Sequence, residues 1–117
     1  MFLAMLQVAI GGAVGSVLRF LTVSTVGAPW ATFIVNVLGS AVMGALFILL
    51  NSRMQYAPLL MTGVLGGFTT FSAFSLDTLK LWQSGEIVQA ALYAAASVVL
   101  SLLAVALGAA LAQRGLA

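Results

Sequence analysis

Charged residues divide this chain into long uncharged stretches. The uncharged runs cover residues 1–18, 20–52, 54–76 and 87–113. A hydrocarbon core about 30 Å thick is crossed by about 20 helical residues, so each run is long enough for one span. The second run leaves room for a turn at residues 27–29. The pattern predicts an all-α membrane protein with four transmembrane helices, over residues 3–25, 30–50, 57–81 and 87–112, in one domain covering residues 1–117.

Composition supports the membrane class and narrows the chemistry. The 117 residues are 63% hydrophobic and 5% charged, whereas soluble domains carry about 25% charged residues. An ordinary water-soluble enzyme is therefore excluded. The chain has no Cys and no His, which removes thiolate and imidazole metal sites and Cys or His nucleophiles. We expect no enzyme, and a net charge of +2 from four basic residues predicts no nucleic-acid partner.

The basic residues also bear on orientation. Four spans would place Arg53 and Arg114 on one side of the membrane, and Arg19 and Lys80 on the other. Because an excess of Lys and Arg in cytoplasmic loops sets topology, this even division gives no strong instruction to insert one way. We therefore expect dual topology and an antiparallel homodimer. The alternative is that lipid or helix hydrophobicity fixes one orientation.

Polar residues recur every four positions in the second and fourth predicted helices, at Thr32, Asn36 and Ser40 and at Tyr93, Ser97 and Ser101. Four residues turn a helix by roughly 400°, so each set lies along one face. One interpretation is that these groups bond to neighbouring helices or to their own backbone. The other is a shared binding or permeation path, for which a stripe of neutral donors suits a small anion.

The third hydrophobic segment contains the weakest helical stretch of the chain. Two adjacent glycines and two β-branched threonines lie within residues 66–70, and both residue types disfavour helix. We expect a break near the bilayer midplane, which would expose carbonyls that can hold a cation. In an antiparallel dimer two such breaks would face one another. The alternative is close helix packing through Gly63 and Gly67, the role we expect for the first-helix pairs Gly11/Gly15 and Gly12/Ser16.

Aromatic and polar residues follow the predicted break on one helix face, at Phe71, Phe74, Ser75 and Thr78. Such a stripe is typical of core packing. The alternative rests on the positive edge of an aromatic ring, which can be offered to an anion.

Three charged residues lie near the predicted span ends, and their positions suggest where their side chains lie. Arg19 lies about one helix length from the start of the chain, so its side chain either snorkels to the interface or forms an electropositive vestibule. We expect Asp77 and Glu86, on either side of the connection between the third and fourth spans, to be solvated.

Three segments together resemble the Fluc (CrcB-like) fluoride channel family, and the resemblance covers nearly the whole chain. The most specific segment runs Gly-Gly-Phe-Thr-Thr-Phe-Ser-Ala-Phe-Ser over residues 66–75, and the others cover residues 11–20 and 35–39. The chain departs from the family pattern at Ser16, Phe20 and Ala73. The resemblance implies passive, channel-type conduction of fluoride through two pores of a dual-topology dimer in the cell (inner) membrane. It also implies a structural sodium ion at the dimer centre.

Carried over by position, the resemblance implies a role for each candidate residue. Phe71 and Phe74 would be the pore phenylalanines, beside the Asn36 amide. The carbonyls of Gly66 and Thr69 would bind sodium, and Arg19 would be the first-helix arginine. The remaining anion-path residues are the hydroxyl track of the last helix, Tyr93, Ser97 and Ser101, together with Thr32 and Ser75 from the polar stripes.

Two other functions fit the size of the chain. A small exporter of cationic drugs, similar to the small multidrug resistance family, would need a carboxylate within the membrane, and the first predicted helix has none. An accessory or structural membrane subunit would use the polar tracks for helix packing. A Phe71→Ile or Phe74→Ile variant separates these interpretations, since only a channel should lose ion flux while it stays assembled.

Overall fold

The computed structural model describes residues 1–116 and contains four helical segments that are long and apolar enough to cross a membrane. They are α1 (Phe2–Val26), α2 (Trp30–Leu49), the third segment (Met54–Gln83) and α5 (Ile87–Leu116). Each lies within four residues of its predicted range at both ends. The all-helical, four-span prediction is therefore confirmed, and the chain is a multi-pass membrane protein.

The third segment is built from several pieces. A short turn, η1 (Met54–Tyr56), leads into the wide helical stretch η2 (Pro58–Leu65), which Pro58 begins. The three residues of α3 (Gly66–Phe68) follow, and α4 (Phe71–Gln83) completes the segment. Residues 69 and 70 between α3 and α4 are not helical, which confirms the predicted break.

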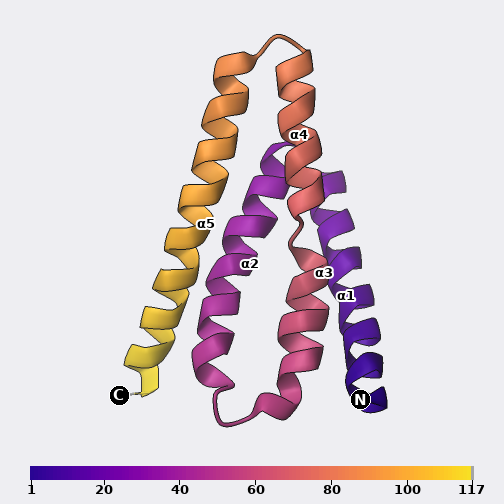
Figure 1. Cartoon of the computed structure of the whole chain (residues 1–117), viewed down its shortest axis with the longest axis vertical. Helices are drawn as coiled ribbons and strands as arrows, with labels where there is room; N and C mark the ends of the chain where they lie inside the picture. The colour runs from indigo at the N-terminus through magenta and orange to yellow at the C-terminus, as the bar shows by residue number, and fades with distance from the viewer. Residues whose placement is uncertain (117) are drawn as a thin grey trace.

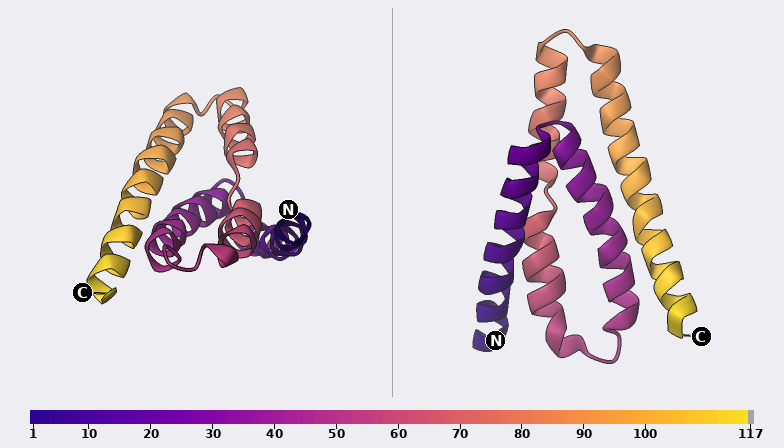
Figure 2. Two further views of the ribbon diagram at one scale, coloured as in Figure 1. Left: turned by 60° about the horizontal axis from the view of Figure 1, so that its bottom comes forward. Right: turned by 180° about the vertical axis from the view of Figure 1, so that it is seen from behind.

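The helices form an open arrangement, because α5 and α4 lean away from α1 (Figures 1 and 2). The start of α1, the end of α5 and the connection between α2 and η1 lie at one end of the molecule, and the turn between α4 and α5 lies at the other (Figure 1). The most extensive packing joins α2 to α5, and α1 packs along η2 and α3. The chain thus forms two helix pairs, and α4 connects them by contacting α5.

Glycines allow both pairs to approach at backbone distance. A Cβ atom at Gly11 would lie 2.9 Å from the Cα of Gly63, and one at Gly67 would lie 2.6 Å from the Gly12 carbonyl oxygen. The predicted packing role is therefore confirmed for Gly11 and Gly15, whereas a Cβ at Gly12 would meet no atom within 4 Å. A second close approach, between α2 and α5, places Gly108 against the Ala41 carbonyl.

Most large apolar side chains point outward. The buried apolar residues are small in number for a chain of this length: Ala31, Val35, Leu50, Leu65, Ala90 and Tyr93. Trp30, Tyr56 and Trp82 are all more than 40% exposed and lie at span ends, where aromatic residues meet the membrane interface. The fold therefore buries polar groups and glycines against one another and leaves its apolar surface for lipid or another protein.

Candidate functional site

The break in the third segment is held by a side chain of α2. Thr69 (φ −84°, ψ 156°) and Thr70 (φ −155°, ψ 120°) are both extended. Asn36 Nδ2 donates to the Thr70 carbonyl at 3.0 Å, and Asn36 Oδ1 accepts from the Thr70 N–H at 2.8 Å. The Thr70 hydroxyl accepts from the Ala73 N–H at 3.1 Å and so caps α4. These bonds satisfy polar groups that non-helical backbone would otherwise leave unpaired in the membrane.

Two carbonyls beside the break lose the amide that a continuous helix would give them. In an α-helix each carbonyl accepts from the N–H four residues later. The N–H of Thr70 would serve Gly66 but donates to Asn36, and the N–H of Ala73 would serve Thr69 but donates to the Thr70 hydroxyl. The Gly66 and Thr69 carbonyls are thus free of these helical bonds, at the partly negative end of a half-helix, where a cation is favoured.

Arg19 of α1 also contacts the break. Its Nε donates to the Gly67 carbonyl at 3.0 Å, and the side chain is partly buried. The guanidinium therefore lies at the C-terminal end of α3 and brings a positive charge to the break. This contact holds the side chain against the third segment, although other guanidinium N–H groups remain free to donate.

A cleft of about 580 Å³ opens beside the break. It lies among α2, the break, α4 and α5, and it brings together most of the residues that the sequence singled out. Gly66, Phe71 and Phe74 line it. Its polar lining comes from Asn36, Ser40, Thr69, Thr70, Ser97 and Ser101.

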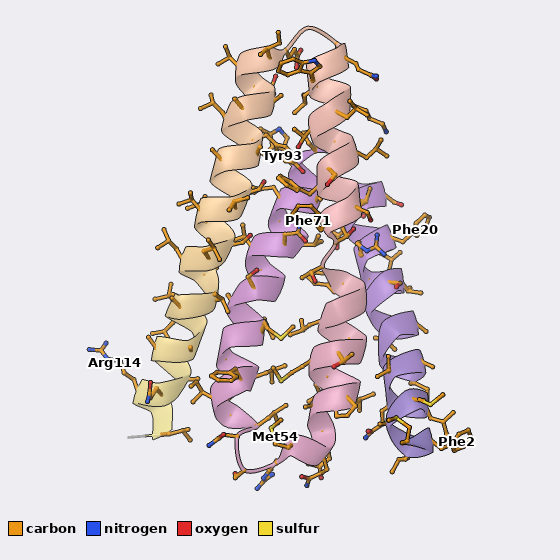
Figure 3. The ribbon with its side chains drawn as sticks, viewed as in Figure 1. Phe2, Phe20, Met54, Phe71, Tyr93 and Arg114 are labelled. Atoms are coloured by element: carbon orange, nitrogen blue, oxygen red, sulfur yellow. The ribbon has the colours of Figure 1, made fainter. Side chains whose placement is uncertain are left out.

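Aromatic rings form one wall of the cleft and continue beyond it. Phe71 and Phe74 meet edge to face, with ring centroids 5.4 Å apart and an interplanar angle of 60°. The Phe74 ring is 5.5 Å from that of Tyr93, whose side chain lies between α4 and α5 (Figure 3). Phe71 is 76% exposed, so its ring is accessible from the open side of the cleft. Ring edges next to neutral donors are suited to an anion.

Ser97 stands out among the polar residues of the cleft. It is 5% exposed, and within residues 1–116 its Oγ is the buried side-chain polar atom with no hydrogen-bond partner. Most buried polar groups in proteins are paired, so an unpaired one requires an explanation. Because Ser97 lines the cleft, its hydroxyl is available to a hydrogen-bond acceptor bound there.

Four predicted site residues lie outside this cleft in the single chain. Thr32 is buried between helices at 2% exposure. The Ser75 hydroxyl is exposed and donates to the carbonyl of Phe71 in its own helix at 2.9 Å. Arg19 contacts the opposite side of the break, and the Tyr93 hydroxyl donates to Asp77. The structure also adds Thr70 to the lining, a residue that the sequence marked only as part of the break.

The expectation of a solvated Asp77 was wrong. Its side chain is 7% exposed, and its Oδ2 accepts from the Tyr93 hydroxyl at 3.2 Å. Glu86 is exposed, as expected. Both residues lie near the turn between α4 and α5, which suggested that both side chains contact water. The helical rotation of α4 instead directs Asp77 toward α5. The signal that could have found it is helical spacing, since Asp77 follows Phe74 by three residues and shares its face.

Comparisons with known proteins show which sequences this chain is similar to. The protein-family model described as "CrcB-like protein, Camphor Resistance (CrcB)" matches residues 6–109 of this chain. The chain is 52% identical over 110 residues to the "Fluoride-specific ion channel FluC" of Paracoccus denitrificans (strain Pd 1222), covering 88% of this chain and 89% of that protein. It is 50% identical over 111 residues to the protein of the same name from Cereibacter sphaeroides (strain ATCC 17029 / ATH 2.4.9), with 87% and 88% covered. A third relative with this name, from Ruegeria sp. (strain TM1040), is 45% identical over 117 residues, with 92% and 93% covered.

Proposed function

This chain belongs to the family of CrcB-like proteins, and from that premise we propose that it is a fluoride-selective channel that lets fluoride leave the cell passively. The single observation that carries the proposal is the buried, unpaired hydroxyl of Ser97 in a cleft shared with Asn36 and Phe71. A donor held without an acceptor in its own chain fits an anion as the missing acceptor. Conduction through a channel forms and breaks no covalent bond, so the proposed activity is not enzymatic.

Hydrogen bonding explains why neutral groups line the path. Moving a bare anion into a low-dielectric interior costs on the order of tens of kcal/mol. A hydrogen bond to a charged group returns about 1.5–3 kcal/mol, so the few donors of the cleft cannot replace all the water around the ion. Fluoride would therefore keep part of its hydration and move between partial sites at Asn36, Ser97 and Ser101. The positive charge of Arg19 at the break lowers the cost further.

The second part of the proposal is an antiparallel homodimer in the cell (inner) membrane. The cleft is open on one side, and the exposed Phe71 ring borders that opening. A second copy inserted the opposite way would close the cleft with its own third segment. The equal division of basic residues between the two ends, with Arg53 and Arg114 against Arg19 and Lys80, is consistent with both orientations.

The third part is a sodium ion at the dimer centre, held by the carbonyls of Gly66 and Thr69. Both carbonyl oxygens lack their helical N–H partner, which leaves them available as cation ligands. Within the described chain no cluster of three His, Cys, Asp or Glu side chains offers another kind of metal site. Two copies would contribute these oxygens to one ion. A bound cation would supply positive potential beside the anion path.

Liposome efflux tests the central proposal. Vesicles carrying the purified protein and loaded with fluoride or chloride should release fluoride far faster than chloride. Phe71→Ile and Phe74→Ile should each lower fluoride release while the protein still elutes as a dimer. Phe20→Ile is the matched control, because Phe20 is 68% exposed on α1, away from the cleft. Equal release of both ions, or none, would refute the channel. Loss of assembly without a specific loss of flux would favour a structural subunit.

Two further measurements test the dimer and the ion separately. A cysteine appended after Ala117 should be labelled from both faces of the membrane, and labelling from one face alone would refute dual topology. Replacing sodium with N-methylglucamine should lower the thermal stability of the purified dimer. An unchanged melting temperature across sodium concentrations would remove the sodium site and leave the fluoride proposal standing.

A further inference from the structure

We propose that Asp77 is a specificity-determining residue of the anion path, because its carboxyl group holds the hydroxyl proton of Tyr93 and only a strong hydrogen-bond acceptor can displace it. The inference rests on the proposed fluoride conduction and assigns a role to a residue that lies outside the cleft. Asp77 acts through Tyr93 and need not touch the ion.

The Asp77–Tyr93 pair is buried in the membrane-spanning part of the molecule. The two side chains are 7% and 2% exposed, and the Tyr93 hydroxyl donates to Asp77 Oδ2 at 3.2 Å. A phenol has a single proton to donate. While this bond stands, Tyr93 offers no donor toward the cleft. At 3.2 Å the bond is longer than a typical hydroxyl–carboxylate hydrogen bond, so an anion that draws the Tyr93 hydroxyl into a shorter bond can displace Asp77.

The Asp77–Tyr93 bond lies next to the proposed anion path, because Tyr93 continues the row of polar residues on α5. Ser101, Ser97 and Tyr93 succeed one another along one face of α5, toward the turn between α4 and α5. The first two line the large cleft, and the ring of Phe74 in the cleft wall contacts that of Tyr93 at a tilt of 39°. Asp77, which accepts from Tyr93, lines a second hollow of about 160 Å³ between α4 and the α1–α2 connection at Ala28 and Pro29. The pair therefore joins the wall of the cleft, through Phe74, to the wall of this smaller hollow, through Asp77.

An ion that moves beyond Ser97 toward the turn must compete with Asp77 for the Tyr93 proton. Fluoride is small and accepts hydrogen bonds about as strongly as a carboxylate, so the exchange is close to balanced. Chloride is larger and a weaker acceptor, so the same exchange is unfavourable. Lys80 also lines the smaller hollow, so this hollow carries a positive charge as well as the Asp77 carboxyl group. The pair thus discriminates by acceptor strength rather than by size alone.

Replacing the carboxyl group tests this role. Asp77→Asn keeps the side-chain volume but makes a weaker acceptor, so Tyr93 is released more easily to a weak anion. The ratio of fluoride to chloride efflux from liposomes should fall by roughly tenfold, the worth of one hydrogen bond to a charged group. Glu86→Gln is the matched control, because it removes the same charge from an exposed position near the same turn. It should leave the ratio unchanged.

A double-mutant cycle shows whether Asp77 acts through Tyr93. Tyr93→Phe should lower the ratio by itself, and adding Asp77→Asn to it should have no further effect. Asp77→Glu retains a carboxyl acceptor and should restore most of the selectivity. If Asp77→Asn fails to assemble, an unchanged ratio in Tyr93→Phe would still contradict the inference.

The outcomes separate this inference from the proposed function. No fluoride efflux from the unaltered chain would overturn both. Selective efflux from the unaltered chain with an unchanged ratio in Asp77→Asn would overturn only the role of Asp77. An equal rise in both fluxes, which removal of a negative charge alone would produce, would also overturn it.

Discussion

Asn36 and Thr70 are joined by two hydrogen bonds, one from the Asn36 amide nitrogen to the Thr70 carbonyl and one from the Thr70 N–H to the Asn36 amide oxygen. A side chain of α2 thereby satisfies both backbone groups of a residue that has left the helix. The same bonds divert the N–H that a continuous helix would give to the Gly66 carbonyl. The residue predicted as an anion donor therefore also holds the break open, and its second amide proton remains available to the cleft.

Replacing Asn36 should affect stability and conduction together. Asn36→Leu leaves the Thr70 N–H and carbonyl without partners, at a cost of about 1–3 kcal/mol for each unsatisfied group. We expect a lower unfolding temperature in detergent and a loss of fluoride efflux. Asn36→Asp keeps the acceptor for the Thr70 N–H and should be less damaging to the fold. Ser40→Ala, one turn later on α2, should leave the unfolding temperature unchanged. Full stability of Asn36→Leu would contradict this role.

Ser97 should show the opposite relation between stability and function. Its hydroxyl is buried without a partner in the described part of the chain, so Ser97→Ala removes a polar group that contributes nothing to folding. We expect unchanged or slightly raised stability, by up to about 1–3 kcal/mol, together with slower fluoride efflux. Thr25→Ala is the control for fluoride efflux, because it also removes a hydroxyl, but one on α1 that donates to the Leu21 carbonyl and does not line the cleft. Destabilisation of Ser97→Ala would mean that the hydroxyl serves packing.

Arg19 contributes a charge and a hydrogen bond that substitutions can separate. Arg19→Lys keeps the positive charge but loses the Nε–H that binds the Gly67 carbonyl. Arg19→Gln can still donate to that carbonyl but is neutral. If the charge attracts anions to the break, efflux should survive in the Lys variant and fall in the Gln variant, measured at low ionic strength where screening is weak. Normal efflux from Arg19→Gln would show that the charge is dispensable.

Two glycines of α1, one in close contact with the third segment and one not, allow the packing of α1 to be tested. A Cβ at Gly15 would meet the Val64 carbonyl and lie 2.8 Å from the Phe68 nitrogen, whereas a Cβ at Gly12 would have no neighbour within 4 Å. Gly15→Ala should therefore destabilise the protein by about 1–3 kcal/mol or more. Gly12→Ala should be neutral, or stabilising by up to about 1 kcal/mol through its helix propensity. Thermal unfolding in detergent measures both, and equal melting temperatures would contradict the close approach.

Helix number and ends were predictable because bilayer thickness imposes a length on every span. The break at Thr69 and Thr70 was also predictable, since two glycines and two threonines in succession disfavour helix whatever surrounds them. The four-residue spacing also predicted which polar residues share a helix face with Asn36 and which share one with Ser97. Helical periodicity is local, so these features needed no knowledge of neighbouring helices.

The partners of each polar group depended on the tertiary structure. Spacing places Asn36 and Arg19 on a face but cannot say that both reach the backbone of the third segment. The spacing grouped Tyr93 with the hydroxyl donors Ser97 and Ser101. The packing of α4 against α5 instead places its hydroxyl where it donates to Asp77. The same packing buries a carboxyl group that its place near a turn suggested was solvated. By itself the sequence determined a four-span membrane protein with an interrupted third segment, because those properties come from composition and local propensity. Only the tertiary structure decided which donors are already used and which, like Ser97, stay free, because hydrogen-bond partners come from segments distant in the chain.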